Sequence, residues 1–417
     1  MTKNTLAIDF GTSNTAAGAL IDGVPQIIPL EGDSDTLPTT IFLDFDRRSV
    51  TYGAEAVNGL IEGRDGRFMR ALKSVLGAPL MREQRQFMNE RKRLLDVVAE
   101  FLAELRLRAE RVTGQSFTAV LSGRPVHFRG AGDDRDAKAI ADLTECYRLA
   151  GFKDIAFMPE PEAAARAVLG PDDGRGAGLV VDIGGGTSDF SVFRYDGEAI
   201  EILASHGLKI GGTDFDRVLS LGHVMPLLGM GSRINNVMGP GSHSAPNGVF
   251  FDLATWEKIP FVYSPATLRE AEELRKLAQK PELLTRLVAV LRDELGHDLA
   301  FAAEAAKIAA NDTGAAKIGL GIVEPGLAAA LSAADLDEEL ADFADQMAAA
   351  AIECAAKAGV RPDEVTRLVF VGGSSLMQVV RGPVSAAFPN AGAEVKEAFT
   401  AIVHGLTRSL APPRRSG

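Results

Sequence analysis

A pattern of three apolar runs and two tight turns occurs twice in this sequence, and it limits the possible folds more than any other feature. In each copy an aspartate ends the first run, Asp9 in one and Asp182 in the other, and a loop rich in glycine, threonine and serine follows. An Asp-Gly pair comes thirteen or fourteen residues after that aspartate, at 22–23 and 196–197. Apolar runs joined by such turns predict antiparallel strands. The sequence therefore predicts a duplicated three-stranded meander, formed by residues 6–8, 16–21 and 26–28 and again by residues 179–181, 190–195 and the run that ends at 203.

Helical patterns follow each meander, so the order is sheet then helices, twice. The expected helices are residues 94–112, 136–150, 163–169 and 336–358. A further strand, residues 368–371, leads into Gly372-Gly373-Ser374-Ser375 and an apolar helix from Leu376, an arrangement typical of ligand clefts in α/β proteins. The stretch 228–264 is rich in Gly, Pro, Ser and Asn, and it is predicted to be an irregular surface excursion. These patterns place the chain in the α/β class.

Charge and composition disfavour several classes of function. The 417 residues include 44 Lys and Arg against 56 Asp and Glu, and a net charge of −12 disfavours sequence-independent binding to nucleic acid or to an anionic membrane. No apolar run approaches the roughly 18 residues of a membrane span, and no cleavable apolar segment begins the chain, so we expect a cytoplasmic protein. Cys146 and Cys354 are expected to be buried structural thiols. The sequence has no Gly-Lys pair, no His-Glu-x-x-His and no Gly-x-Ser-x-Gly, so P-loop, zinc-protease and α/β-hydrolase sites are not supported.

The two Asp-x-Gly loops suit the binding of a phosphate. Glycines and hydroxyl residues at a hairpin tip let successive backbone N–H groups point at one anion, so that a phosphate is held without basic side chains. Asp9 and Asp182 would repel this phosphate unless a divalent cation lay between them, and Mg2+ held through waters by one or two carboxylates fits that requirement. A turn that only caps a hairpin is the alternative for either loop taken alone.

Six motifs carry a resemblance to a known family. In order along the chain they are Asp9-Phe10-Gly11-Thr12-Ser13-Asn14, residues 160–165, residues 182–189, residues 211–216, residues 304–307 and residues 371–375. On these motifs the chain resembles the ATPase domain of the seventy-kilodalton heat-shock (DnaK-type) chaperones, and within the actin-like superfamily it looks most like the short YegD-like branch. The resemblance implies an α/β actin-like ATPase fold, with two lobes of duplicated βββαβα (ribonuclease H-like) topology and a nucleotide cleft between them. It also implies ATP or ADP and Mg2+ as ligands, and slow ATP hydrolysis.

The resemblance further implies roles for individual residues. The phosphates would be bound by a first loop, Gly11, Thr12, Ser13 and Asn14, and by a second loop, Gly184, Gly185, Gly186 and Thr187. The catalytic set would be Lys73, which helps to position the attacking water, Glu160 beside that water and the metal, Asp9 and Asp182, which hold the waters of the magnesium, and Asp189 behind them. The nucleoside would be contacted by Glu304, Lys307 and Asn311, and enclosed by Gly211, Gly212, Thr213, Gly372, Gly373 and Ser374. Phosphoryl transfer needs mainly orientation and charge neutralisation, which a metal, a lysine and a carboxylate supply.

These residues also have purely structural interpretations. Glu304 and Lys307 would then form an exposed i,i+3 ion pair, and Lys73 would be a solvated surface lysine. Gly211-Gly212 would be only a loop tip, and Gly372-Gly373 would only allow close packing of a helix on a strand.

The sequence departs from the family at several positions. Asn14 stands where the chaperones commonly carry an aromatic residue, Leu376 where they carry an arginine against the base, and Thr213 where they carry an acid. These changes bear on the affinity and selectivity for the base. The chaperones continue into a peptide-binding β-domain, whereas this chain stops twelve residues after Gly405, so we expect no binding of extended apolar peptides by the usual route.

The sequence thus predicts two lobes and a nucleotide-driven function. Lobe I is residues 1–173 plus 395–417, and it carries the first phosphate loop, Lys73 and Glu160; lobe II is residues 174–394. The expected function is that of an ATP-dependent, chaperone-like switch that acts on a partner protein or client of unknown identity. Two other functions share the phosphate loops: a filament-forming or cell-shape protein of the MreB or FtsA type, and a small-molecule kinase of the sugar-kinase type.

Overall fold

The computed structural model describes residues 4–88, 90–126, 128, 133–170, 173–197, 199–395 and 399–411. The chain forms two compact units. Unit 1 consists of Met1–Leu208, Ala350–Leu376 and Ser385–Gly417, and unit 2 consists of Lys209–Ala349 and Met377–Val384. Unit 1 therefore contains both of the predicted meanders, and the lobe boundaries at residues 173 and 394 stay a prediction.

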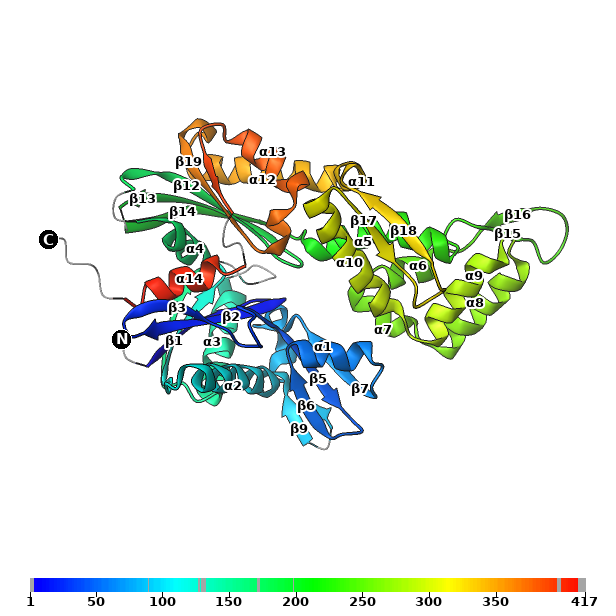
Figure 1. The fold of residues 1–417 in the computed structure, drawn as a ribbon, viewed down its shortest axis with the longest axis horizontal. Helices are drawn as coiled ribbons and strands as arrows, with labels where there is room; N and C mark the ends of the chain where they lie inside the picture. Colours follow the sequence, from blue (N-terminus) through cyan, green and yellow to red (C-terminus); the bar gives the residue numbers. More distant parts are fainter. Residues whose placement is uncertain are drawn as a thin grey trace. The chain divides into compact units, whose positions relative to one another are not determined.

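The first sheet of unit 1 contains the first predicted meander (Figure 1). Its strands, in the order β11-β10-β1-β2-β3, are β1 (Thr5–Phe10), β2 (Asn14–Ile21), β3 (Val24–Ile28), β10 (Ala119–Arg124) and β11 (Asp154–Pro159), and β4 (Leu37–Pro38) also pairs with β2. β1, β2 and β3 pair antiparallel, whereas β10 and β11 extend the sheet in parallel. Successive residues of β1 pack into two different apolar clusters, because side chains alternate across a strand. This strand is therefore buried on both faces.

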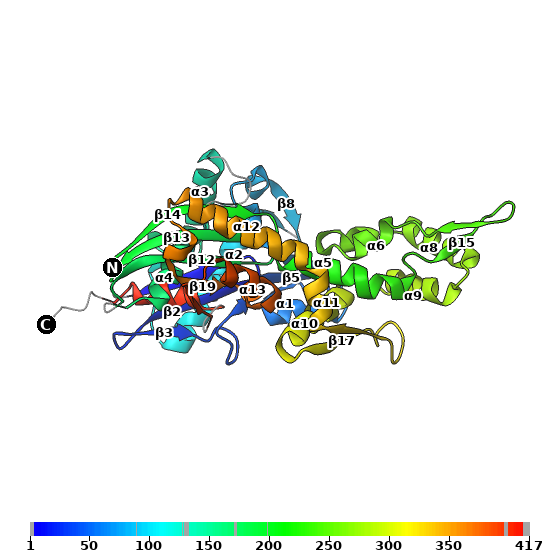
Figure 2. The ribbon, with the colours of Figure 1, turned by 90° about the horizontal axis from the view of Figure 1, so that it is seen from above.

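The second sheet of unit 1 repeats the topology of the first. Its strands, in the order β14-β13-β12-β19-β20, are β12 (Arg175–Ile183), β13 (Ser188–Asp196), β14 (Ala199–Leu208), β19 (Val365–Val371) and β20 (Gly392–Glu394). The first three pair antiparallel, and β19 and β20 follow in parallel. Helix α12 (Ala341–Lys357) runs over this sheet (Figure 2), where the Cys354 thiol donates to the Phe190 carbonyl at 3.3 Å. The predicted duplication within an α/β fold of the actin-like type is confirmed.

Helices α4 (Glu160–Val168) and α14 (Ala401–Arg408) join the two sheets through one apolar cluster. The cluster includes Ala7 of β1, Ala164 of α4, Val180 of β12 and Leu406 of α14. The sequence places the start of α4 at residue 163, but the helix begins three residues earlier, at Glu160. Proline is tolerated in the first turn of a helix because the N–H that it lacks has no partner there, so Pro161 does not prevent the helix from beginning at Glu160.

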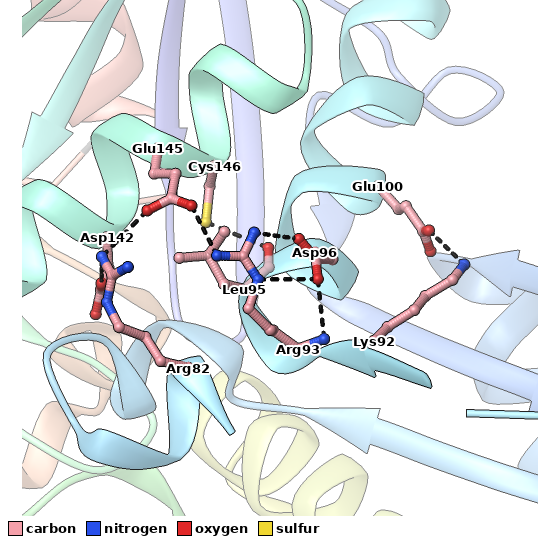
Figure 3. A network of polar contacts seen from close by, with 9 residues as sticks. All are labelled: Arg82, Lys92, Arg93, Leu95, Asp96, Glu100, Asp142, Glu145 and Cys146. Carbon is pink, nitrogen blue, oxygen red and sulfur yellow. Dashed lines mark hydrogen bonds and ion pairs between the residues drawn. The ribbon is translucent and has the colours of Figure 1, made fainter. Parts of the chain in front are cut away.

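Ion pairs join residues 82–93, which precede α2 (Leu94–Thr113), to helices α2 and α3 (Asp133–Leu149) (Figure 3). Arg93 bonds to Asp96 at 2.6 Å and to Glu145 at 2.8 Å, and Arg82 bonds to Asp142 at 2.7 Å. Cys146 is buried beside this network, so the expectation that both cysteines are buried thiols is confirmed. The remaining elements of unit 1 are β5 (Thr40–Asp44), β6 (Ser49–Tyr52), β7 (Gly66–Arg70), β8 (Gln84–Phe87), β9 (Glu90–Arg93), α1 (Ala54–Ile61) and the 3-10 helices η1 (Leu72–Val75), η2 (Pro79–Arg82), η6 (Pro362–Glu364) and η7 (Gly373–Leu376).

Unit 2 is mainly helical. Its elements are α5 (Gly212–Leu219), the π-helix η3 (Ser220–Val224), η4 (Met225–Leu228), β15 (Arg233–Asn235), β16 (Ser242–Ser244), α6 (Gly248–Leu253), η5 (Trp256–Lys258), α7 (Ile259–Val262), α8 (Pro265–Leu277), α9 (Pro281–Arg292), α10 (Gly296–Thr313), β17 (Ala315–Gly319), β18 (Ala328–Ser332) and α11 (Ala333–Glu339). Helices α12 and α13 (Gln378–Ala387) run from one unit into the other along the chain. Within the described ranges, no helix combines the length and hydropathy that a membrane span needs.

Two predictions for this part of the chain need correction. The stretch 228–264 is more regular than its composition suggests: β15 and β16 form a hairpin that extends beyond α8 and α9 (Figure 2), and buried Phe250 and Ile259 anchor short helices after it. The single helix predicted over 336–358 is two helices, α11 and α12, because the chain turns at Leu340. Leu340 is fully buried, so tertiary packing holds a break that the apolar pattern does not reveal.

Candidate functional site

Asp9 and Asp182 occupy equivalent positions in the two sheets. Asp9 lies near the end of β1, opposite Ala16 of β2, and Asp182 lies near the end of β12, opposite Asp189 of β13. Both are partly exposed, although the residues on either side of them are buried. The duplication therefore places one carboxylate at the carboxyl end of each first strand, where open α/β sheets bind their ligands.

The two predicted phosphate loops lie against each other. A Cβ added to Gly185 of the second loop would come within 2.8 Å of the Ser13 Oγ of the first loop. The second loop is a tight turn, in which the Gly184 N–H donates to the Thr187 carbonyl at 2.9 Å. In the first loop, a Cβ on Gly11 would lie 2.1 Å from the Asn14 carbonyl oxygen. Only glycine fits at position 11, because the atom that a Cβ would meet there belongs to the backbone, and a loop without side chains is what a phosphate cradle requires.

Lys73 reaches Glu160 across 87 residues of sequence. Its Nζ lies 2.7 Å from the Glu160 Oε1, and the two side chains are only 12% and 9% exposed. The interpretation of Lys73 as a solvated surface lysine is therefore wrong. Glu160 is the first residue of α4, where the partial positive charge of a helix N-terminus favours a carboxylate. Gly123 of β10 makes room for it, since a Cβ there would lie 3.2 Å from the Glu160 Cγ.

The segment that carries Lys73 is anchored to helix α3. The buried Asp142 accepts a hydrogen bond from the Gly77 N–H at 3.0 Å through Oδ2, and it binds Arg82 at 2.7 Å through Oδ1. Gly77 has a φ of 75°, and a Cβ on it would lie 2.7 Å from the Arg135 carbonyl. One carboxylate thus holds the chain on the C-terminal side of Lys73 at two points.

Burial and mutual repulsion dominate the electrostatics of this site. Burial, followed by the charge of Glu160, raises the pKa of Asp9 from 3.8 to about 7, although Lys73 opposes the change. Burial, Glu160, Asp189 and Asp9 raise the pKa of Asp182 well above its usual range. Burial alone would lower the pKa of Lys73, but Glu160, Asp9 and Asp182 outweigh it and raise that pKa. The single positive charge of Lys73 does not balance the negative charges of the carboxylates around it.

This excess of negative charge fits a magnesium ion held through waters. Across the residues that the structure describes, no three Asp, Glu, His or Cys side chains converge closely enough to bind a metal directly. Mg2+ commonly keeps several of its waters and uses only one or two carboxylates, so Asp9 and Asp182 suit it as a pair. A divalent charge beside them would also favour their ionised forms.

The third glycine motif lies beside Asp182. Gly372 has a φ of 81°, and a Cβ on it would lie 2.4 Å from the Ile183 carbonyl oxygen and 3.1 Å from the Asp182 Oδ1. Gly373 begins the 3-10 helix η7, which also contains the partly exposed Ser374. The structure therefore brings this motif to the same place as the two catalytic aspartates that the sequence predicts.

The other predicted nucleoside contacts belong to unit 2. Gly211 and Gly212 are buried at the start of α5, where the Gly211 N–H donates to Asp214 at 3.1 Å, and Thr213 follows in the first turn. Their burial excludes the interpretation of this pair as an exposed loop tip.

Helix α10 carries the remaining three predicted contacts. Lys307 is buried and pairs with Asp216 at 2.7 Å, so it does not form the alternative exposed pair with Glu304. Glu304 is partly exposed one turn earlier. Asn311 accepts a hydrogen bond from the Gln378 N–H at 2.8 Å. The nucleoside roles of these residues stay predictions.

Sequence reasoning missed several residues that hold the site together. Asp216 lies within the recognised motif 211–216, but nothing in the sequence pairs it with Lys307. Asp142 and Gly123 carry no local signal, because their partners are far away in the chain: Asp142 bonds to residues 60 and 65 positions away. Such contacts exist only after the chain has folded.

Comparisons with known proteins show which proteins this chain resembles in sequence. The family model described as Hsp70 protein matches residues 82–229, which include Glu160, Asp182 and the second phosphate loop. Over these residues the chain is similar to the Hsp70 family. The chaperone protein HscA homolog of Burkholderia ambifaria is 30% identical over 244 residues, which are 55% of this chain and 38% of that protein. The HscA homolog of Rickettsia bellii is 24% identical over 303 residues, which are 67% of this chain and 49% of that protein. The matched segments thus span less than half the length of these two relatives.

Proposed function

We propose that this Hsp70-type domain binds ATP with Mg2+, hydrolyses it slowly and acts as a chaperone-like switch on a partner protein. The observation that carries the proposal is the buried Lys73–Glu160 pair, which lies with Asp9 and Asp182 beside the two glycine loops. The likeness to HscA chaperones supports it over the filament-forming and sugar-kinase alternatives. A cytoplasmic location and membership of the YegD-like branch are part of the same proposal.

Binding would rest on backbone rather than on basic side chains. The loops that contain Gly11 and Gly185 would direct N–H groups at the phosphate oxygens, since glycine leaves their backbone free of side chains. Asp9 and Asp182 would hold the magnesium through its waters, and the ion would supply the positive charge that neutralises the phosphate oxygens. This is how a chain with a net charge of −12 can bind a polyphosphate.

Hydrolysis would depend on the orientation of a water. The Glu160 Oε1 receives the Lys73 ammonium at 2.7 Å, so this carboxylate is fixed in position, and its Oε2 would accept a hydrogen bond from the attacking water. The Lys73 ammonium would stabilise the negative charge that develops on the phosphoryl oxygens. These groups act by positioning and charge, which are the main requirements of phosphoryl transfer. Closure of lobes I and II on the nucleotide would be the output that the partner senses.

Single-turnover hydrolysis of ATP tests this proposal. We expect phosphate release with Mg2+ and none in excess chelator. We also expect that Asp9→Asn releases no phosphate with Mg2+. Asp22→Asn is the matched control, because Asp22 is an exposed aspartate in the β2–β3 turn of the same sheet. Hydrolysis that continues undiminished in chelator, or in Asp9→Asn, would refute the role of the metal.

Two further measurements separate the alternatives. Sedimentation with ATP would reveal a filament-forming protein, and faster turnover with a sugar hydroxyl as acceptor would reveal a kinase. We expect neither.

A further inference from the structure

Phe399 occupies the space that a side chain at Gly373 would take. A Cβ added to Gly373 would lie 2.6 Å from the Phe399 Cε1 and 3.0 Å from its Cζ. The ring therefore rests on the backbone of the third glycine motif. Phe399 is nevertheless 54% exposed. Single exposed phenylalanines are common on protein surfaces, whereas one that lies against a glycine motif beside a candidate ligand site is not explained by chance exposure alone.

This position is close to the nucleotide site proposed above. The preceding residue, Gly372, approaches the Asp182 Oδ1, because a Cβ on it would lie 3.1 Å from that oxygen. The residue under the ring therefore directly follows the residue that lies beside a carboxylate proposed to hold the metal.

The geometry of η7 also relates Phe399 to Leu376. A 3-10 helix has three residues per turn, so side chains at positions i and i+3 lie on the same side of it. Gly373 and Leu376 are the first and last residues of η7 and have this spacing. The Phe399 ring, which fills the side-chain space of Gly373, thus lies on the same side of η7 as Leu376. Leu376 stands where the similar chaperones commonly carry an arginine against the base, and leucine has no planar group to stack there.

We propose that the exposed face of Phe399 is the surface on which the nucleobase stacks, and that it favours purine over pyrimidine nucleotides. An aromatic ring offers a flat apolar face to any base, and the larger ring system of a purine covers more of it. The inference rests on the proposed nucleotide binding and adds the side chain that would replace the missing base contact at Leu376.

Calorimetric titrations with Mg2+ and three probes test this proposal. ADP has a purine base, CDP has a pyrimidine base, and tripolyphosphate has no base. Phe399→Ala is expected to lower the affinity for ADP about tenfold or more and to reduce the preference for ADP over CDP. The affinity for tripolyphosphate should change by less than about twofold. Phe399→Trp is expected to retain ADP binding. Phe45→Ala is the control, because Phe45 is 44% exposed directly after β5 of the same unit.

The outcomes distinguish this proposal from the one on which it rests. Unchanged tripolyphosphate binding shows that Phe399→Ala is folded. An equal loss of ADP and tripolyphosphate, or an ADP affinity that matches Phe45→Ala, would overturn the stacking role. If the unaltered protein bound ADP and tripolyphosphate and Phe399→Ala changed neither, only the stacking role would fall. If the unaltered protein bound neither probe, the proposed nucleotide binding would fail as well.

Discussion

Replacing Lys73 by methionine removes the cation of the buried ion pair and keeps most of the volume of the side chain. Loss of one partner of a buried pair typically costs about 3–5 kcal/mol, because the other charge remains buried and uncompensated. The Lys73 and Glu160 side chains keep 12% and 9% exposure, so we expect about 3 kcal/mol, at the lower end of that range. Lys73 also lowers the pKa of Asp9, so its removal would add to the repulsion among the carboxylates.

Urea unfolding without nucleotide measures this loss. Lys92→Met is the matched control, because Lys92 pairs with Glu100 at a similar distance, 2.6 Å, but at a more exposed place. Exposed pairs contribute about 0–1 kcal/mol, so the control should change little. The double variant Lys73→Met/Glu160→Gln should recover most of the stability, since no uncompensated charge is left at the pair.

Kinetics separate the catalytic role of Lys73 from its structural role. Lys73→Met is expected to lower kcat about 10²-fold, the scale of a lost electrostatic or acid–base group, while the affinity for ATP stays nearly intact because the loops and the metal supply the contacts of the ground state. The double variant should regain stability but not turnover. If Lys73→Met unfolded at the same urea concentration as Lys92→Met and hydrolysed ATP normally, the reasoning from the buried pair would be refuted.

Three further substitutions test other parts of the site. Folding raises the pKa of Asp9 from 3.8 to about 7, so between these two pH values the folded protein keeps a proton on Asp9 that the unfolded chain releases. Above pH 7 the carboxyl is ionised in both states, and its burial then destabilises the fold most. Nucleotide-free Asp9→Asn should therefore resist urea better than the unaltered protein above pH 7, with a gain that shrinks as the pH falls toward 3.8; a gain independent of pH would contradict this. Gly372→Ala should cost about 2 kcal/mol or more and weaken ADP binding, because φ is 81° and the Cβ would meet the Ile183 carbonyl at 2.4 Å; an unchanged melting temperature and ADP affinity would argue against it. Asp142→Ala removes the anchor of the Lys73 segment, so kcat should fall together with about 1–3 kcal/mol of stability, and a loss of stability with normal kcat would show that Asp142 does not position Lys73.

The sequence alone predicts the duplicated sheets, the glycine loops and their two aspartates. These features depend on local rules: alternating apolar runs form strands, Asp-Gly pairs form tight turns, and glycine permits close approach of backbone. Both meanders form where the pattern predicts them. The start of α4 is the local exception, because a proline within its first turn hides the true beginning of the helix.

Only the tertiary structure decides which distant residues meet. Lys73 and Glu160 are 87 residues apart, Phe399 and Gly373 belong to different segments, and no pattern in the sequence joins either pair. The break at Leu340 also depends on tertiary packing, because a buried leucine is expected at any apolar position of a helix and does not indicate a break. Hydrophobic periodicity indicates which face of a helix or strand is buried, but it does not indicate which other element covers that face. The charge balance that makes this site suitable for a metal and a phosphate therefore arises only when the two sheets fold around α4 and α14 and bring their carboxylates together.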